Sequence, residues 1–167
     1  EILFFFCIPF ACLFTYHCLN IIFRKVPDRQ NEKRITGILI LTLFTAGIFF
    51  ERNTYTAITF ISTAFLLFVC RYFFHIRWTG QVYRAYALLL IPFLVVNGIL
   101  TGTGLAEPVV WYNNDETMKV RILTIPFEDI LFGFELIFMT TFFYELFLTL
   151  FKSKRRKTAE GKFVTEA

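Results

Sequence analysis

The sequence predicts an all-α, multi-pass transmembrane helical bundle with about five spans. Hydrophobic residues make up 56% of the 167 positions and only 18% are charged, whereas a soluble domain carries about 25% charged residues. The mean hydropathy is +0.59. The charges are also segregated, because the apolar runs contain only Glu135 and Glu145. This separation favours a chain solvated by a lipid bilayer, and the short basic clusters between the runs make nucleic acid an unexpected partner.

Five runs have the length and composition of membrane spans. They cover residues 2–23, 35–50, 53–70, 85–106 and 130–151. At about 1.5 Å per residue, a run of 22 residues covers roughly 33 Å, which is enough for a hydrocarbon core of about 30 Å. The second run has 16 residues and is short, so it must borrow flanking residues to cross.

The basic residues between the runs predict the orientation. Lys and Arg are dense after the first run, after the third and in the tail 152–167, and sparse in the other connections. Basic residues near span ends are retained in the cytoplasm. We therefore expect a multi-pass protein of the cell membrane with a basic cytoplasmic tail, and the long connection from Gly102 to Pro126 on the outer face.

The start of the chain resembles its last apolar run. A shift of 128 residues places Glu1 on Asp129 and Tyr16 on Tyr144, and it also superposes five phenylalanines of the first run on five of the last. The match predicts an internal helical repeat within a membrane domain 1–151, with the second repeat centred on 107–151. Because the chain opens on Glu1 without Met, we interpret the N-terminal part of the first repeat as missing.

No pattern in the sequence predicts a metal or a cofactor. The four cysteines have no CxxC spacing, the two histidines have no partner at ligand spacing, and there is no P-loop or dinucleotide motif. The informative stretch is the outer connection and the start of the last run. There Pro126 suits the first turn of a helix, so that Glu128 and Asp129 fall where the helix dipole favours anions.

Two interpretations of these acids remain open on spacing alone. They are either helix-terminal anions or catalytic groups. Glu135 lies two turns beyond Glu128 on the same face, where an ionisable group inside a membrane suggests a function. The alternative interpretation of Glu135 is a structural acid that is hydrogen-bonded to a neighbouring helix.

The run Pro126-Phe-Glu-Asp-Ile-Leu-Phe132 resembles the Pro-x-Glu-acid-x-x-Phe signature of the integral-membrane lycopene cyclase domain family, the two-subunit or fused carotenoid cyclases. Trp111-Tyr112-Asn113, Tyr55-Thr56-Ala57 and the opening Glu1-Ile2-Leu3-Phe4-Phe5 are also similar to the fused form. The resemblance extends from residue 1 to about 151. It implies carotenoid biosynthesis by a lycopene β-cyclase, an isomerase that closes β-ionone end rings by acid–base catalysis without a redox cofactor.

The resemblance also implies residue roles. Glu128 is expected as the general acid, Asp129 as the group that orients or shares the proton, and Glu1 as the complementary base. The residues expected to bind substrate are Trp111, Tyr112, Asn113, Arg121, Pro126, Phe127, Phe132 and Glu135. No metal is expected at the site.

Alternative functions stay open at this point. The chain could be a related carotenoid hydratase, a cyclase of longer carotenoids, or a non-catalytic carotenoid-binding membrane subunit. The expected partners are lycopene or a related carotenoid and the lipid bilayer. A homo-oligomer and association with other carotenoid enzymes are further alternatives.

Overall fold

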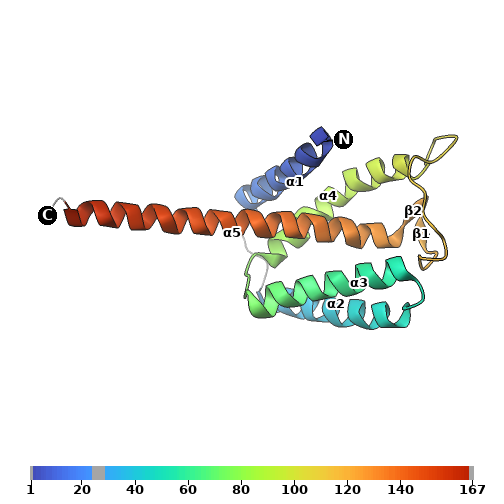
Figure 1. Cartoon of the computed structure of the whole chain (residues 1–167), viewed down its shortest axis with the longest axis horizontal. Coiled ribbons are helices and arrows are strands. Elements are labelled where there is room, and N and C mark those ends of the chain that lie inside the picture. Colours follow the sequence, from blue (N-terminus) through green and yellow to red (C-terminus); the bar gives the residue numbers. More distant parts are fainter. Residues whose placement is uncertain (1, 24–28, 166–167) are drawn as a thin grey trace.

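The computed structural model describes residues 2–23 and 29–165 and confirms the all-α fold class. Within those residues the helices are α1 (Ile2–Ile22), α2 (Arg29–Phe49), α3 (Thr54–Phe68), α4 (Thr79–Leu100) and α5 (Phe127–Thr165). A π-helical turn, η1 (Val69–Phe73), continues α3, and the short strands β1 (Arg121–Ile122) and β2 (Ile125–Pro126) form a hairpin before α5. The helices lie lengthwise beside one another, and α5 extends beyond the rest (Figure 1).

Three of the described helices are long and apolar enough to cross a membrane. They are Thr54–Phe73, Thr79–Leu100 and Phe127–Phe151, and they support the expected membrane protein. In the part of α1 whose side chains the structure describes, the apolar helix Phe6–Ile22 is shorter, and the first turns of α2 carry Glu32, Lys33 and Arg34. Because charges are costly in the hydrocarbon core, the crossings expected for α1 and α2 stay predictions.

Several helix boundaries differ from the predicted runs, and α5 in particular extends from Phe127 to Thr165, beyond the run 130–151. The fourth helix was expected over 85–106, but α4 runs from Thr79 to Leu100, because Gly102 and Gly104 adopt φ values of +103° and +80° that end a right-handed helix. The second helix was expected from residue 35, but α2 already begins at Arg29. This gives α2 a polar first part that the apolar run did not reveal.

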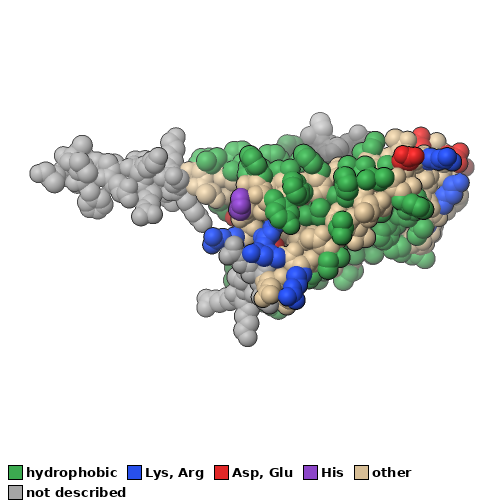
Figure 2. All heavy atoms as spheres, turned by 90° about the horizontal axis from the view of Figure 1, so that it is seen from below, with side chains coloured by type: hydrophobic (Ala, Val, Ile, Leu, Met, Phe, Trp, Pro, Cys, Tyr) green, Lys and Arg blue, Asp and Glu red, His purple; other side chains and the backbone are tan. Residues whose placement is uncertain are grey.

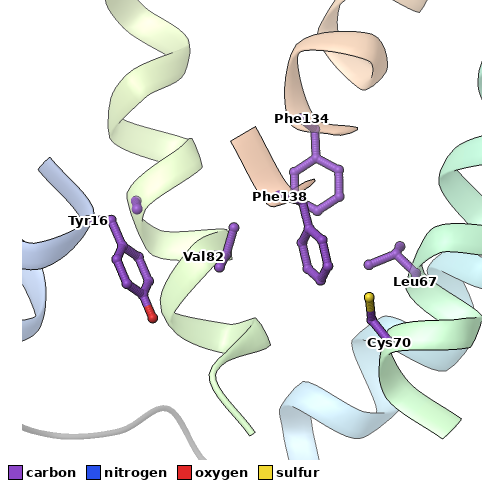
Figure 3. Close-up of a cluster of buried hydrophobic side chains, with 7 residues drawn as sticks. Tyr16, Leu67, Cys70, Val82, Phe134 and Phe138 are labelled. Atoms are coloured by element: carbon purple, nitrogen blue, oxygen red, sulfur yellow. The ribbon is translucent and has the colours of Figure 1, made fainter. Parts of the chain in front are cut away.

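The main apolar core lies between α3, α4 and α5. Phe134 and Phe138 of α5 lie beside Leu67 of α3 and Cys70 of η1, with Val82 of α4 on their other side (Figure 3). Tyr16 of α1 also belongs to this buried cluster. The core thus fixes α5 against α3 and α4, and it leaves the N-terminal ends of α3 and α5 to form a polar site at one end of the bundle.

Candidate active site

The connection between α4 and α5, residues 101–126, is tied to the start of α3. The backbone amides of Tyr55 and Thr56 donate to the Glu116 carbonyl at 3.0 and 3.3 Å. Asn53 Nδ2 also donates to a carbonyl of the connection at 2.8 Å. The first amides of a helix have no partner in their own helix, so the connection supplies one and fixes its own position over the first turn of α3.

The β1–β2 hairpin leads directly into α5. Ile122 pairs with Ile125 in the hairpin, and the Phe127 amide donates to the Val120 carbonyl at 3.0 Å. Pro126 was expected in the first helical turn, but it lies buried in β2 because the hairpin pairing continues up to it. As predicted, the first turn of α5 contains the two acids of the signature.

Glu128 is fully buried, with 0% of its surface exposed. Its Oε1 accepts a hydrogen bond from the Thr56 hydroxyl and another, at 2.8 Å, from the Met118 amide. Its Oε2 is also buried and has no hydrogen-bond partner within residues 2–23 and 29–165. The carboxyl is therefore fixed by one oxygen to α3 and to the α4–α5 connection, which leaves the other oxygen for a proton or a ligand.

Asp129 is bound through both of its oxygens. Oδ1 accepts from the Tyr55 hydroxyl at 2.8 Å, and Oδ2 accepts from Asn97 Nδ2 at 2.8 Å and from the Tyr112 hydroxyl at 2.7 Å. Burial, together with the hydrogen bond to Asp129 and its charge, raises the pKa of Tyr112 above its usual value. Tyr112 therefore stays a hydrogen-bond donor, and Asp129 acts as a fixed acceptor.

Glu135 forms a second carboxyl–hydroxyl pair between α5 and α3. The Ser62 hydroxyl donates to Glu135 Oε2 at 2.9 Å, and Glu135 is half-buried. Glu128 and Glu135 are seven residues apart on α5 and bond to hydroxyls of the same neighbouring helix. This geometry agrees with the interpretation of Glu135 as an acid that is hydrogen-bonded to a neighbouring helix.

Two residues expected to bind substrate lie near the carboxyls. Tyr112 contacts Asp129 directly, and Phe127 packs against a small apolar cluster that also includes Phe60 and Met118. Met118 provides the amide that binds Glu128. Glu1, the expected base, lies outside the described residues.

Four other expected residues lie elsewhere on the surface. Trp111 and Phe132 are 77% and 46% exposed. Asn113 Nδ2 donates to the Glu116 side chain at 3.2 Å. The Arg121 guanidinium donates to the Asn114 side chain and the Thr124 carbonyl, at 2.6 and 3.1 Å, because β1 presents both of its side chains to the exterior.

Sequence reasoning did not assign the donors that hold the two acids. Tyr55 and Thr56 entered only through the family resemblance, and their contact with α5 joins residues more than 70 positions apart. Asn97 carried a usable signal, since it is an amide within an otherwise apolar run. The Met118 amide is a main-chain group and leaves no trace in the residue type.

The fold and the site define a helical membrane protein with two buried carboxyls at one end of its bundle. The family model described as lycopene cyclase matches residues 52–147, which is more than half of the chain and includes both acids and all of their donors. The chain belongs to the lycopene cyclase family, as the resemblance in its sequence implied. No curated protein and no solved structure matches the chain.

Proposed function

We propose that this protein is a lycopene β-cyclase, which forms β-ionone end rings by acid–base catalysis without a redox step. Membership of the lycopene cyclase family supports a carotenoid cyclase in general. The finer proposal rests on one observation. Glu128 is fully buried, and only one of its carboxyl oxygens is hydrogen-bonded within the described residues.

The reaction needs one proton donor and one base. Glu128 Oε2 gives its proton to the terminal alkene of lycopene, which leaves a carbocation on the adjacent carbon. The neighbouring double bond attacks this cation, and the new carbon–carbon bond closes a six-membered ring. The base then removes a proton from the ring, and the electrons of that C–H bond form the ring alkene. One proton enters and one leaves, so the product is an isomer of the substrate.

The hydrogen bonds of Glu128 support its role as the acid. The Thr56 hydroxyl and the Met118 amide both donate to Oε1, so the proton of the neutral acid belongs on Oε2. Phe60, Phe127 and Met118 belong to the neighbouring apolar cluster. An apolar surrounding excludes water that would otherwise trap the carbocation as an alcohol.

Asp129 has a different role in this proposal. Because three donors occupy its two oxygens, it serves as a fixed negative charge that stabilises the carbocation, and it orients rather than shares the proton. The rings of Tyr55 and Tyr112 lie beside it, with centroids 6.1 Å apart. An aromatic face can stabilise a nearby cation by about 0.5–2 kcal/mol. Glu1 keeps its proposed role as the complementary base, on the strength of the family resemblance.

The proposed setting is the cell membrane. Residues 1–151 would form the membrane domain, with the site at the outer face and the basic tail 152–167 in the cytoplasm. The distribution of Lys and Arg supports this orientation, and the three helices of membrane-spanning length support the membrane setting. Lycopene dissolves in the bilayer, so an intramembrane site matches the location of the proposed substrate.

The test is Glu128→Gln, which keeps the size of the side chain and removes the transferable proton. In cells that supply lycopene, the wild-type protein should produce carotenoids with β-rings, which differ from lycopene in retention and absorption but not in mass. The Glu128→Gln variant should accumulate lycopene while its abundance in the membrane stays near the wild-type level. Pigment extraction followed by chromatography and mass measurement provides the readout.

Glu116→Gln is the matched control, because it makes the same chemical change at an exposed side chain of the neighbouring connection; it should cyclise normally. Products heavier by one water would identify a hydratase, and unchanged pigment with the wild-type protein would identify a binding subunit. Normal ring formation by Glu128→Gln would exclude obligatory proton transfer at this residue.

A further inference from the structure

The connection between α4 and α5 exposes apolar side chains well beyond the helices. Val109, Trp111 and Leu123 are 66%, 77% and 80% exposed. Leu105, Val120 and Ile122 are also exposed. These six residues are called the apolar loop surface below. Single exposed apolar residues are ordinary, but a group of large ones on one connection marks an interaction site.

The fold places this surface at the level of a membrane boundary. The connection joins the end of α4 to the start of α5, and both helices are long and apolar enough to cross a bilayer. It also binds the start of α3, so three such helices end beneath it (Figure 1). Charged side chains gather at this end of the molecule, next to an extended apolar surface along the helices (Figure 2).

Leu123 is an unusual residue for the turn that it occupies. It lies between β1 and β2 with φ +57°, in the left-handed region that hairpin turns normally fill with Gly, Asn or Asp. A bulky residue in this region is disfavoured by backbone sterics, and this one also exposes 80% of its surface. Entry of the side chain into an apolar phase removes the cost of its exposure to water, and this favours a lipid contact at Leu123.

The composition of the connection favours lipid over a protein partner. Trp111 has the amphipathic ring that is enriched at membrane–water interfaces. Lys119 and Arg121 lie among the apolar residues with exposed side chains, and they can reach phosphate groups while their neighbours enter the acyl region. The apolar loop surface is also continuous in the chain with the helices that cross the bilayer.

We propose that the apolar loop surface is immersed in the outer boundary of the lipid bilayer, and that the polar stretch 113–116 remains in water. Trp111 is adjacent to Tyr112, which donates to Asp129. Immersion therefore anchors in lipid the same connection that provides donors to both buried carboxyls. The inference concerns membrane contact, so it stands independently of the reaction proposed for the site.

Tryptophan fluorescence tests this placement directly. The chain has two tryptophans, so Trp78→Phe leaves Trp111 as the single emitter. The full chain is placed in phosphatidylcholine vesicles whose acyl chains are brominated either near the headgroup or near the chain end. We expect blue-shifted emission, a large loss of intensity with headgroup-proximal bromine, a small loss with distal bromine, and weak quenching by aqueous acrylamide.

The matched control moves the emitter by four residues. Asp115→Trp in the background of Trp78→Phe and Trp111→Phe places the indole at a position whose native side chain is 88% exposed, within the polar stretch. It should emit at longer wavelength and be quenched by acrylamide. If Trp111 is quenched by acrylamide as strongly as this control and shows no loss with brominated lipid, the surface is not immersed. The fluorescence is read without substrate, so cyclase activity has no bearing on either outcome.

Discussion

Thr56 provides the one side-chain hydroxyl that holds Glu128 among the described residues. Thr56→Val keeps the shape of this buried side chain and removes its donor. A typical hydrogen bond contributes about 0.5–1.5 kcal/mol, and 1.4 kcal/mol corresponds to about tenfold in rate. We expect β-ring formation to fall by up to about tenfold with little change in abundance, as measured by pigment analysis in lycopene-producing cells.

Thr63→Val is the control for this experiment. Thr63 is also fully buried on α3, but its hydroxyl donates to the Thr59 carbonyl within the helix. The same chemical change should leave cyclisation near normal there. Equal losses in the two variants would mean that Thr56 acts on the stability of α3 and not on Glu128.

The Tyr112–Asp129 hydrogen bond predicts a dependence of stability on pH. The pKa of Tyr112 is raised above its ordinary value of 10.0, with burial as the largest cause. The folded state therefore binds the Tyr112 hydroxyl proton more tightly than the unfolded state. The contribution of this group to the free energy of unfolding is complete below about pH 10 and is lost as the pH rises through the folded-state pKa. In detergent at neutral pH, the wild-type protein should have a higher midpoint of thermal unfolding than Tyr112→Phe. The difference between the two midpoints should shrink only beyond pH 10. A difference that shrinks below pH 9 would contradict this.

At the scale of elements, α2 and the π-helical turn η1 are joined by a buried ion pair. Arg71 Nη1 lies 3.3 Å from Glu32 Oε1, and the two side chains are only 10% and 5% exposed. Breaking such a pair by removing one partner leaves a buried charge without compensation, at a cost of about 3–5 kcal/mol. Arg71→Met should therefore lower the midpoint of thermal unfolding in detergent substantially.

The double variant separates the charge from the packing. Adding Glu32→Gln to Arg71→Met removes the uncompensated charge, so it should recover part of the lost stability. A double variant as unstable as the sum of its single variants would show that the pair has no coupling. This pair also gives the polar start of α2 a tertiary contact, since Glu32 is buried there while its neighbours Lys33 and Arg34 are exposed.

The two helices of the predicted repeat are buried differently. In α5, Phe134 and Phe138 are 6% and 0% exposed, whereas Phe6 and Phe10, which the predicted repeat aligns with them, are both 72% exposed in α1. The core side of α1 instead contains Tyr16. Similar sequences thus present different faces because α5 has helices on several sides, while the described part of α1 packs mainly along α4 and α5. The repeat itself stays a prediction.

At the scale of the whole molecule, the proposed orientation can be tested by labelling. The start of α2, which contains Gln30, and the α4–α5 connection, which contains Asn114, lie at opposite ends of the bundle (Figure 1). The Lys and Arg distribution predicts that Asn114 faces outward and Gln30 inward. In a cysteine-free background, Asn114→Cys should react with an impermeant thiol reagent in intact cells, and Gln30→Cys should react only after permeabilisation. The reverse pattern would place the site on the cytoplasmic face.

The sequence by itself determined the helical class, the position of most helices and the stretch that contains the acids. These features depend on composition and on local order: apolar runs of helical length, charges between them, and a proline ahead of two acids at a helix start. The lycopene cyclase resemblance was also present in contiguous residues, and the family match confirmed it.

Only the tertiary structure decided which hydrogen bonds the carboxyl oxygens of Glu128 and Asp129 accept. Glu128 and Asp129 are neighbours with nearly identical local signals, yet one leaves an oxygen without a partner in the described residues and the other accepts three hydrogen bonds. The difference arises from Thr56, Asn97 and the Met118 amide, which come from separate elements. Hydrogen bonds between distant segments depend on how helices pack, and packing is a property of the whole chain that no local pattern of residues specifies.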